Sequence, residues 1–240
     1  MSLKAVLFDF NGIIIDDESI HAKIMEELLL EENLVLQKGE YEEVCLGRSD
    51  RSCLRDLLES RGRFVNNDFL SRLMQKKAQR YLSRIEALEE LPIYGGVREF
   101  LNRLQELGIK LGIVSGATRQ EIELVLNMTQ LYEFFPIIIA GDDINSSKPE
   151  PEGYLLAVNQ MNKEFPDLNL HPSECLGIED TPVGVTAVKN AGMQVLGVAN
   201  TYPFHMLHRC CNWVVDYFSD LELDRVISVY SQQDLETTPS

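Results

Sequence analysis

The stretch Ala5-Val6-Leu7-Phe8-Asp9-Phe10-Asn11-Gly12 decides the fold of this chain. Its first four residues form a continuous apolar run, and the run stops at Asp9. An apolar run that is bounded in this way is typical of a buried strand in a parallel sheet. The pattern recurs at residues 111–114, 137–140 and 175–178, with weaker candidates at 194–199 and 213–215. The sequence therefore predicts four buried strands and two weaker ones.

Helical patterns separate these strands. One helix is indicated by four apolar residues on a single face and a glycine after them as a stop signal: Val97, Phe100, Leu101, Leu104 and Gly108. Thr118 and Glu121 form a capping box before a second helix, and Thr181 precedes a proline at the first position of a third. Because strands and helices alternate, we expect an α/β fold with a Rossmann-like, doubly wound parallel sheet.

The alternation is interrupted between residues 17 and 90. Apolar residues recur there at helical spacing around residues 20–28, 54–58 and 69–85, and no convincing strand lies between them. We therefore expect a helical cap, residues 17–90, inserted into a core that comprises residues 1–16 and 91–230. Hinges between the two should lie near residues 14–17 and 88–95. Residues 231–240 are predicted to form a polar, frayed tail.

The composition is that of a globular protein with a strong negative charge. The 240 residues include 22 Lys and Arg against 38 Asp and Glu, which gives a net charge of −16. A surface of this sign repels nucleic acid and anionic lipid, so neither nucleic acid nor a membrane is expected as a partner. No apolar stretch approaches 18 residues, and the five cysteines have no framework spacing. The sequence predicts a soluble, cytoplasmic protein with reduced thiols, in which Cys45 and Cys53 are packing residues of the cap.

Polar residues follow each of the four main predicted strands. They are Asp9, Asn11 and Gly12 after the first, Ser115 and Gly116 after the second, Asp142, Asp143 and then Lys148 after the third, and Glu179 and Asp180 after the fourth. Ligands of open α/β sheets bind beyond the carboxyl ends of the strands, so this set should meet at one edge. A carboxylate can attack phosphorus, and crowded carboxylates suggest a divalent cation such as Mg²⁺. A lysine and a serine there can hold phosphoryl oxygens.

Four segments resemble the motifs of the haloacid-dehalogenase superfamily of phosphatases. They are FDFNGIIIDDE, IVSGAT, SKPEPEGY and GIEDTPVGVTAVKNAGM, and they occur in the family's order over nearly the whole chain. The helical insertion after the first motif is similar to the cap of the β-phosphoglucomutase and phosphoglycolate-phosphatase branch. The resemblance implies Mg²⁺-dependent hydrolysis of a small phosphorylated metabolite, such as a sugar phosphate, through an aspartyl-phosphate.

The resemblance also implies roles for individual residues. Asp9 would be the nucleophile, and the Mg²⁺ ligands would be Asp9, the backbone carbonyl of Asn11 and Asp180, with Glu179 helping directly or through water. Ser115 and Lys148 would hold the phosphoryl group, together with backbone N–H groups near Gly12 and Gly116.

Asn11 departs from the family pattern. Phosphatases of this family carry Asp two residues after the nucleophile, where it protonates the leaving oxygen and then activates water. An amide cannot donate and recover a proton near pH 7, and general acid–base help is worth roughly 10²–10⁴-fold. We therefore expect a slow phosphatase, one restricted to good leaving groups, or one with a substitute acid/base. His21, four residues after Asp17, is a candidate substitute, and the alternative is a surface histidine on an amphipathic helix.

The cap should contribute to substrate binding. Arg48 and Arg51 are candidates for gripping the substrate when the cap closes, and the alternative is ordinary solvated charge. Two other functions stay open: a phosphoglucomutase-like transfer of the phosphoryl group to a sugar hydroxyl, and a catalytically silenced homologue that binds a phosphorylated ligand. The segment before Gly47 lacks the lysine of the mutase branch. The chain is expected to be a monomer or a weak dimer.

Overall fold

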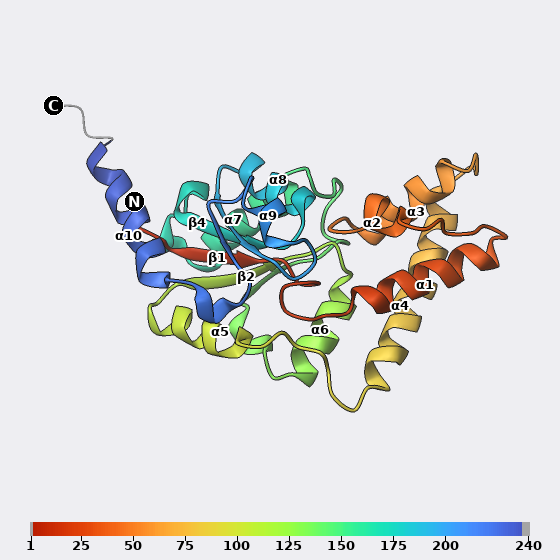
Figure 1. Cartoon of the computed structure of the whole chain (residues 1–240), viewed down its shortest axis with the longest axis horizontal. Helices are drawn as coiled ribbons and strands as arrows, with labels where there is room; N and C mark the ends of the chain where they lie inside the picture. The colour runs from red at the N-terminus through yellow and green to blue at the C-terminus, as the bar shows by residue number, and fades with distance from the viewer. Residues whose placement is uncertain (1, 237–240) are drawn as a thin grey trace.

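A parallel sheet forms the centre of the computed structural model, which describes residues 2–236 (Figure 1). Within these residues the sheet has six strands in the order β3-β2-β1-β4-β5-β6. The strands are β1 (Ala5–Phe8), β2 (Lys110–Val114), β3 (Ile137–Ile139), β4 (Cys175–Glu179), β5 (Gln194–Val198) and β6 (Trp213–Val215). All neighbouring strands are parallel, so the predicted doubly wound sheet is confirmed.

Strand β1 lies in the middle of the sheet and is fully buried. It pairs with β2 on one side and β4 on the other, and Phe8 lies opposite both Ile113 and Ile178. Because this register aligns the carboxyl ends of the three strands, the residues that follow them must meet at one edge of the sheet.

Helices cover both faces of the sheet (Figure 1). They are α5 (Val97–Glu106), α6 (Arg119–Met128), α7 (Glu152–Glu164), α8 (Pro182–Asn190), α9 (Phe204–Leu207) and α10 (Leu223–Glu236). Val6 and Phe8 point into the apolar core shared with α5, α6 and α10, whereas Ala5 and Leu7 point into the core shared with α7 and α8. Successive residues of a strand face opposite sides, which explains why this strand reads as a continuous apolar run.

The predicted helix starts of α6 and α8 are confirmed. The backbone N–H of Thr118 donates to Glu121 Oε2 at 3.2 Å at the start of α6. At the start of α8, Thr181 Oγ1 accepts a hydrogen bond from the N–H of Gly184 at 3.2 Å, and Pro182 occupies the first helical position. Both helices begin beside the carboxyl edge of the sheet, so these caps also position the loops of that edge.

Four helices separate β1 from α5 and project beyond the carboxyl edge of the sheet (Figure 1). They are α1 (Glu18–Glu31), α2 (Glu40–Val44), α3 (Asp50–Glu59) and α4 (Asn67–Glu86). Helix α1 packs against α4, and α4 also contacts α6 of the core. The described residues between 17 and 90 contain no strand, as expected. The boundaries at residues 17 and 90 themselves stay a prediction.

The predicted polar tail is wrong for residues 231–236, because α10 continues to Glu236. Leu223, Val226 and Tyr230 are buried, and the hydroxyl of Tyr230 donates to the backbone oxygen of Cys175 at 2.7 Å. These contacts hold the helix on the core, and helical geometry then extends into the polar residues that follow. Residues 237–240 of the predicted tail lie outside the described residues. No helix among residues 2–236 has the length and apolar character needed to cross a membrane.

The expectation that all five thiols are reduced is wrong. Cys45, at the end of α2, and Cys53, in α3, form a disulfide with a Cα–Cα distance of 4.8 Å. The turn between the two short helices folds α2 back beside α3, and eight residues of separation do not reveal this from the sequence. Cys175, Cys210 and Cys211 are free thiols.

Candidate active site

Three carboxylates meet at the carboxyl edge of the sheet. Asp9 follows β1, Glu179 ends β4 and Asp180 follows it, and one oxygen from each lies within 4.8 Å of the others. All three side chains are buried. Burial, and then the charge of Asp9, raises the pKa of Glu179 to about 7, although Lys148 lowers it. Burial and the carboxylates of Asp9 and Glu179 raise the pKa of Asp180 well above its usual value.

This cluster could hold a metal ion. Within the described part of the chain, Asp180 Oδ1 and Glu179 Oε2 are buried without a hydrogen-bond partner. A buried carboxylate oxygen normally has a partner, and an all-oxygen donor set suits a hard cation such as Mg²⁺. The residues therefore fit the ion that the sequence predicts.

Two glycines make room for these carboxylates. A Cβ at Gly12 would lie 1.9 Å from Asp180 Oδ2, and a Cβ at Gly184 would lie 1.9 Å from Glu179 Oε2. Gly12 also has a φ of +76°, a conformation that other residues rarely adopt. The turn after β1 can therefore pass close to Asp180 only with glycine at this position.

Lys148 lies directly beside the carboxylates. Its Nζ is 2.9 Å from Asp9 Oδ1 and 2.6 Å from Glu179 Oε1, and the hydroxyl of Tyr154 donates to Glu179 Oε1 at 2.6 Å. Burial disfavours the ammonium, but Asp9 and Glu179 outweigh burial and raise the pKa of Lys148 above its usual value. The site thus keeps one fixed positive charge next to Asp9.

Ser115 and Gly116 follow β2 at the same edge. Ser115 is buried, its Oγ accepts the backbone N–H of Ala117 at 3.0 Å, and its hydroxyl lies 3.5 Å from Asn11 Oδ1. At Gly116 a Cβ would lie 2.5 Å from the backbone oxygen of Arg48. The core and the segment before α3 therefore approach each other closely at this turn. Asp142 and Asp143, in contrast, both bind Arg119 and do not join the carboxylate cluster.

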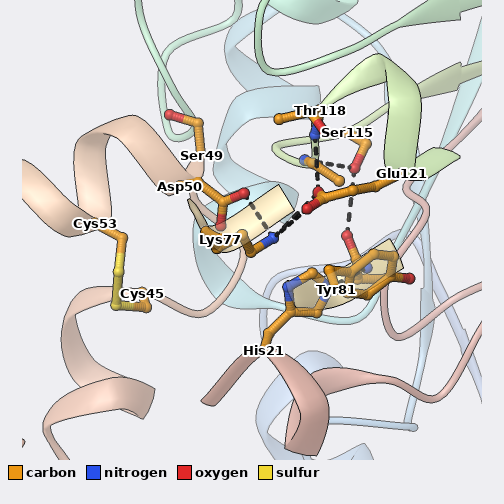
Figure 2. Close-up of polar contacts among 12 residues, drawn as sticks. His21, Cys45, Ser49, Asp50, Cys53, Lys77, Tyr81, Ser115, Thr118 and Glu121 are labelled. Carbon is orange, nitrogen blue, oxygen red and sulfur yellow. Dashed lines mark hydrogen bonds and ion pairs between the residues drawn. A yellow bond between two sulfur atoms is a disulfide. The ribbon is translucent and has the colours of Figure 1, made fainter. Parts of the chain in front are cut away.

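Asn11 is held by a buried network at the start of the inserted helices. Its Nδ2 donates to both oxygens of Asp17 at 3.0 Å and lies 3.0 Å from His21 Nε2. His21 Nε2 is 3.3 Å from Asp17 Oδ2, and its ring stacks on Tyr81 (Figure 2), whose hydroxyl also donates to Asp17.

The charges of this network depend on each other. Burial, together with the charge of Lys77, opposes protonation of His21, but Asp17 outweighs both and raises the pKa of His21. Burial opposes the charged form of Asp17. The charge of His21 and the hydrogen bonds that Asp17 accepts outweigh burial, so the pKa of Asp17 is lowered. The alternative of a surface histidine is therefore wrong, because His21 is 5% exposed.

A small cavity of about 30 Å³ lies beside Asp9 and Asn11. Its lining from the inserted helices includes Glu18, His21, Tyr41, Cys45, Arg48 and Cys53. The hydroxyl of Tyr41 donates to Glu18 Oε2 at 2.8 Å, and burial raises the pKa of Glu18. The sequence reasoning missed both residues. Glu18 stands beside Asp17 at the start of a helix, which is a signal that could have been used, whereas Tyr41 lies in a helix too short to show periodicity.

The two arginines that were candidates for substrate binding differ in position. Arg48 lines the cavity, where its Nη2 lies 2.7 Å from Asp56 Oδ2 and its Nη1 donates to the backbone oxygen of Val44 at 3.0 Å. Arg51 is not among the residues that line the cavity. The guanidinium of Arg48 is thus paired within the inserted helices, and a substrate contact of Arg48 or Arg51 stays a prediction.

Comparisons with known proteins agree with this geometry. The family model described as haloacid dehalogenase-like hydrolase matches residues 6–198. The putative phosphatase YhcW of Bacillus subtilis is 28% identical over 96% of this chain and 99% of its own length, and β-phosphoglucomutase of the same organism is 26% identical over 96% of both chains. The crystal structure of β-phosphoglucomutase from Clostridium difficile has a TM-score of 0.82 at 24% identity, over 97% of this chain and 99% of the other. The chain belongs to the haloacid dehalogenase-like hydrolases.

Proposed function

We propose that the protein is a Mg²⁺-dependent phosphatase that hydrolyses a small phosphate monoester, resembling a sugar phosphate, through an aspartyl-phosphate on Asp9. The observation that carries this proposal is the position of Asp9, whose Oδ1 lies 2.9 Å from Lys148 Nζ and whose carboxylate adjoins Asp180. Asp9, Asp180 and the backbone carbonyl of Asn11 would hold Mg²⁺, with help from Glu179. When bound, the ion offsets the negative charge of the phosphoryl group and orients it.

The protein side chains divide the chemistry between them. An oxygen of Asp9 forms a bond to phosphorus while the bond from phosphorus to the leaving oxygen breaks. Water then attacks the aspartyl-phosphate, which releases phosphate and restores Asp9. Lys148 and Ser115 hold the phosphoryl oxygens, assisted by backbone N–H groups near Gly12 and Gly116. Local charge is essential here, because the chain as a whole carries −16 and repels a phosphorylated substrate.

Asn11 sets the rate. Its amide is fixed by Asp17, so it can donate a hydrogen bond but cannot deliver a proton to a leaving oxygen. His21 lies 3.0 Å from this amide, and we assign it the task of holding Asn11 and Asp17 in place. Without acid–base help, we expect turnover to be roughly 10²–10⁴-fold slower for a poor leaving group.

The cavity wall supports a sugar phosphate as the substrate class. Glu18, Tyr41 and His21 line the same cavity as Asp9 and carry hydrogen-bonding groups, which suits the hydroxyl groups of a sugar. The relationship to a β-phosphoglucomutase supports a phosphorylated sugar as the ligand.

The first test is hydrolysis of 4-nitrophenyl phosphate with and without Mg²⁺, by this chain, by Asn11→Asp and by Asp9→Asn. We expect Mg²⁺-dependent turnover that Asp9→Asn abolishes. Turnover by Asn11→Asp alone would favour the silenced homologue that binds a phosphorylated ligand. If neither this chain nor Asn11→Asp turns over, the assigned metal and phosphate groups are wrong.

Phosphoryl transfer to a sugar hydroxyl is the second candidate function. It is favoured by the 26% identity to β-phosphoglucomutase over 96% of both chains. Incubation with glucose 1-phosphate, followed by separate measurement of inorganic phosphate and glucose 6-phosphate, distinguishes the two. Release of phosphate without glucose 6-phosphate would exclude the transfer reaction for this sugar.

A further inference from the structure

The disulfide between Cys45 and Cys53 forms part of the cavity wall. Both residues line the cavity that adjoins Asp9, and both are buried, with exposed fractions of 6% and 1%. Figure 2 shows the bridge between α2 and α3, close to Ser49 and Asp50. The bond closes a ring of backbone that runs from residue 45 to residue 53, which we call the cap ring.

The cap ring carries further parts of the same wall. Gly47, Arg48 and Asp50 lie inside the ring and also line the cavity. Five of the residues that form this wall therefore belong to one covalently closed segment, so its conformation sets the shape of the cavity on the side of the inserted helices.

The cap ring also touches the turns of the core that surround Asp9. The backbone N–H of Ser49 donates to Ser147 Oγ at 2.6 Å, next to Lys148. The backbone oxygen of Arg48 fills the space where Gly116 would carry a Cβ, at 2.5 Å. A Cβ at Gly47 would lie 2.4 Å from Thr181 Oγ1, directly after Asp180. A displaced ring would therefore lose its fit to three turns of the site.

Helix α2 is held by the disulfide together with several non-covalent contacts. The helix has five residues, Glu40–Val44, and none of them is buried. Its side-chain contacts are the hydrogen bond from Tyr41 to Glu18, the ion pair of Glu40 with Arg61, and the packing of Tyr41 and Val44 against the apolar core. A helix this short is not stable by itself, so the covalent link to α3 adds to these contacts in fixing the start of the ring.

We propose that the Cys45–Cys53 disulfide is a positioning element for substrate binding, and that its reduction loosens the cap ring and weakens binding of the substrate. This inference rests on the proposed phosphatase function. A dithiol reductant supplies the two electrons: its thiolate attacks the sulfur of Cys45, the more exposed of the two residues, and Cys53 leaves as a thiolate that takes up a proton. The second thiolate of the reductant then displaces Cys45, which leaves a cyclic disulfide of the reductant and two cysteine thiols.

The state of the bond is measured first. Alkylation of the unfolded chain without reductant should modify three cysteines, and alkylation after dithiothreitol should modify five. Modification of five cysteines in the untreated protein, purified without reductant, would overturn the proposal.

Kinetics then separate positioning from general damage. For 4-nitrophenyl phosphate, reduction should raise KM about tenfold and change kcat less than about twofold, because the phosphoryl-binding groups belong to the core. Inhibition by inorganic phosphate, which contacts the core groups alone, should keep its constant. Reoxidation with oxidised glutathione should restore the original KM.

Variants provide the matched controls. Cys45→Ser with Cys53→Ser should reproduce the reduced kinetics and no longer respond to dithiothreitol. Cys210→Ser removes a thiol outside the cavity and should keep both the original KM and the response. An unchanged KM after verified reduction, or a double variant that still responds, would overturn the proposal.

A second readout does not depend on turnover. Hydrogen exchange of the backbone amides of residues 46–52, including Ser49, should accelerate on reduction while the amides of β1 stay protected. If the chain shows no phosphatase activity, this measurement still tests the ring: unchanged exchange after reduction would show that the disulfide does not hold it. Failure of the proposed function and failure of this inference are thereby distinguished.

Discussion

Replacing Lys77 by methionine should lower the free energy of unfolding by about 3–5 kcal/mol. Lys77 belongs to α4 and is completely buried between α3 and α6 (Figure 2). Its Nζ lies 2.7 Å from Asp50 Oδ2 and 3.1 Å from both oxygens of Glu121. Because Asp50 belongs to the inserted helices and Glu121 to the core, this one ammonium joins the two parts of the chain.

The magnitude follows from the charges left behind. At an effective dielectric constant of about 20, each of these contacts is worth roughly 5–6 kcal/mol before desolvation. Removing three ions from water costs several kcal/mol each, so the intact triad contributes little net stability. In Lys77→Met, however, the carboxylates of Asp50 and Glu121 remain buried without a positive partner, and this penalty accounts for the predicted loss.

Urea unfolding followed by circular dichroism measures the loss, with Lys76→Met as the matched control. Lys76 is the neighbouring residue of α4 and pairs with Glu31, but the exposed fractions of these side chains are 50% and 40%. An exposed pair of this kind is worth about 0–1 kcal/mol. Adding Asp50→Asn and Glu121→Gln to Lys77→Met should recover most of the stability, because no buried charge is then left unpaired. Equal losses in Lys77→Met and Lys76→Met would refute the reasoning.

The pH dependence provides an independent check. Burial opposes the charge of Lys77, but Asp50 and Glu121 outweigh burial and raise its pKa. A lysine with a raised folded-state pKa contributes stability that is complete below the unfolded value of about 10.4 and is lost as the pH rises through the folded value. The difference between the original chain and Lys77→Met should therefore stay constant from about pH 7 to 9 and shrink above about pH 10.5.

Three further outcomes can be checked with the same proteins. Gly12→Ala should lower kcat/KM by about 10²-fold or more, because the new Cβ would displace Asp180. Gly39→Ala is the control, because Gly39 also has a positive φ but has open space around it. It should lower the free energy of unfolding in urea by about 1–2 kcal/mol and leave activity unchanged. Chelation by EDTA should abolish hydrolysis of 4-nitrophenyl phosphate, and added Mg²⁺ should restore it, which a metal-independent reaction would not show. Burial raises the pKa of Cys175 to about 12, so iodoacetamide at pH 8 should leave this thiol unmodified in the folded chain, as peptide mass mapping would reveal.

The sheet and the convergence of Asp9, Lys148 and the Glu179–Asp180 pair could be predicted from the sequence for one physical reason. A buried parallel strand has to be apolar along its whole length, so its carboxyl end is marked by the first polar residue. Because parallel strands align these ends, residues far apart in the sequence meet without any knowledge of side-chain packing. The register of β1 against β2 and β4 shows this alignment, because Phe8 lies opposite both Ile113 and Ile178.

The contacts between the inserted helices and the core could not be predicted in this way. Periodicity indicates a helix over residues 69–85 and shows which side is apolar, but it does not show that the resulting α4 docks on α6. Lys77 reads as a solvated charge until Glu121 is seen beside it. The same holds for His21, which is buried because Tyr81 of α4 stacks on its ring, and for Cys45 and Cys53, which are brought together by a turn between two helices.

Asn11 follows a strand of the core and is bound by residues of the inserted helices, so its role depends on both parts of the chain. In the proposed mechanism Lys148, Ser115 and the carboxylates of the core bind the phosphoryl group, and none of these depends on proton transfer at residue 11. The demand for a proton comes from the leaving oxygen: a nitrophenolate departs readily without one, whereas a sugar alkoxide does not. Restoring the carboxyl group in Asn11→Asp should therefore accelerate hydrolysis of a sugar phosphate far more than hydrolysis of 4-nitrophenyl phosphate. Equal acceleration of both would mean that Asn11 acts on the position of the phosphoryl group or of the cap and not on the proton.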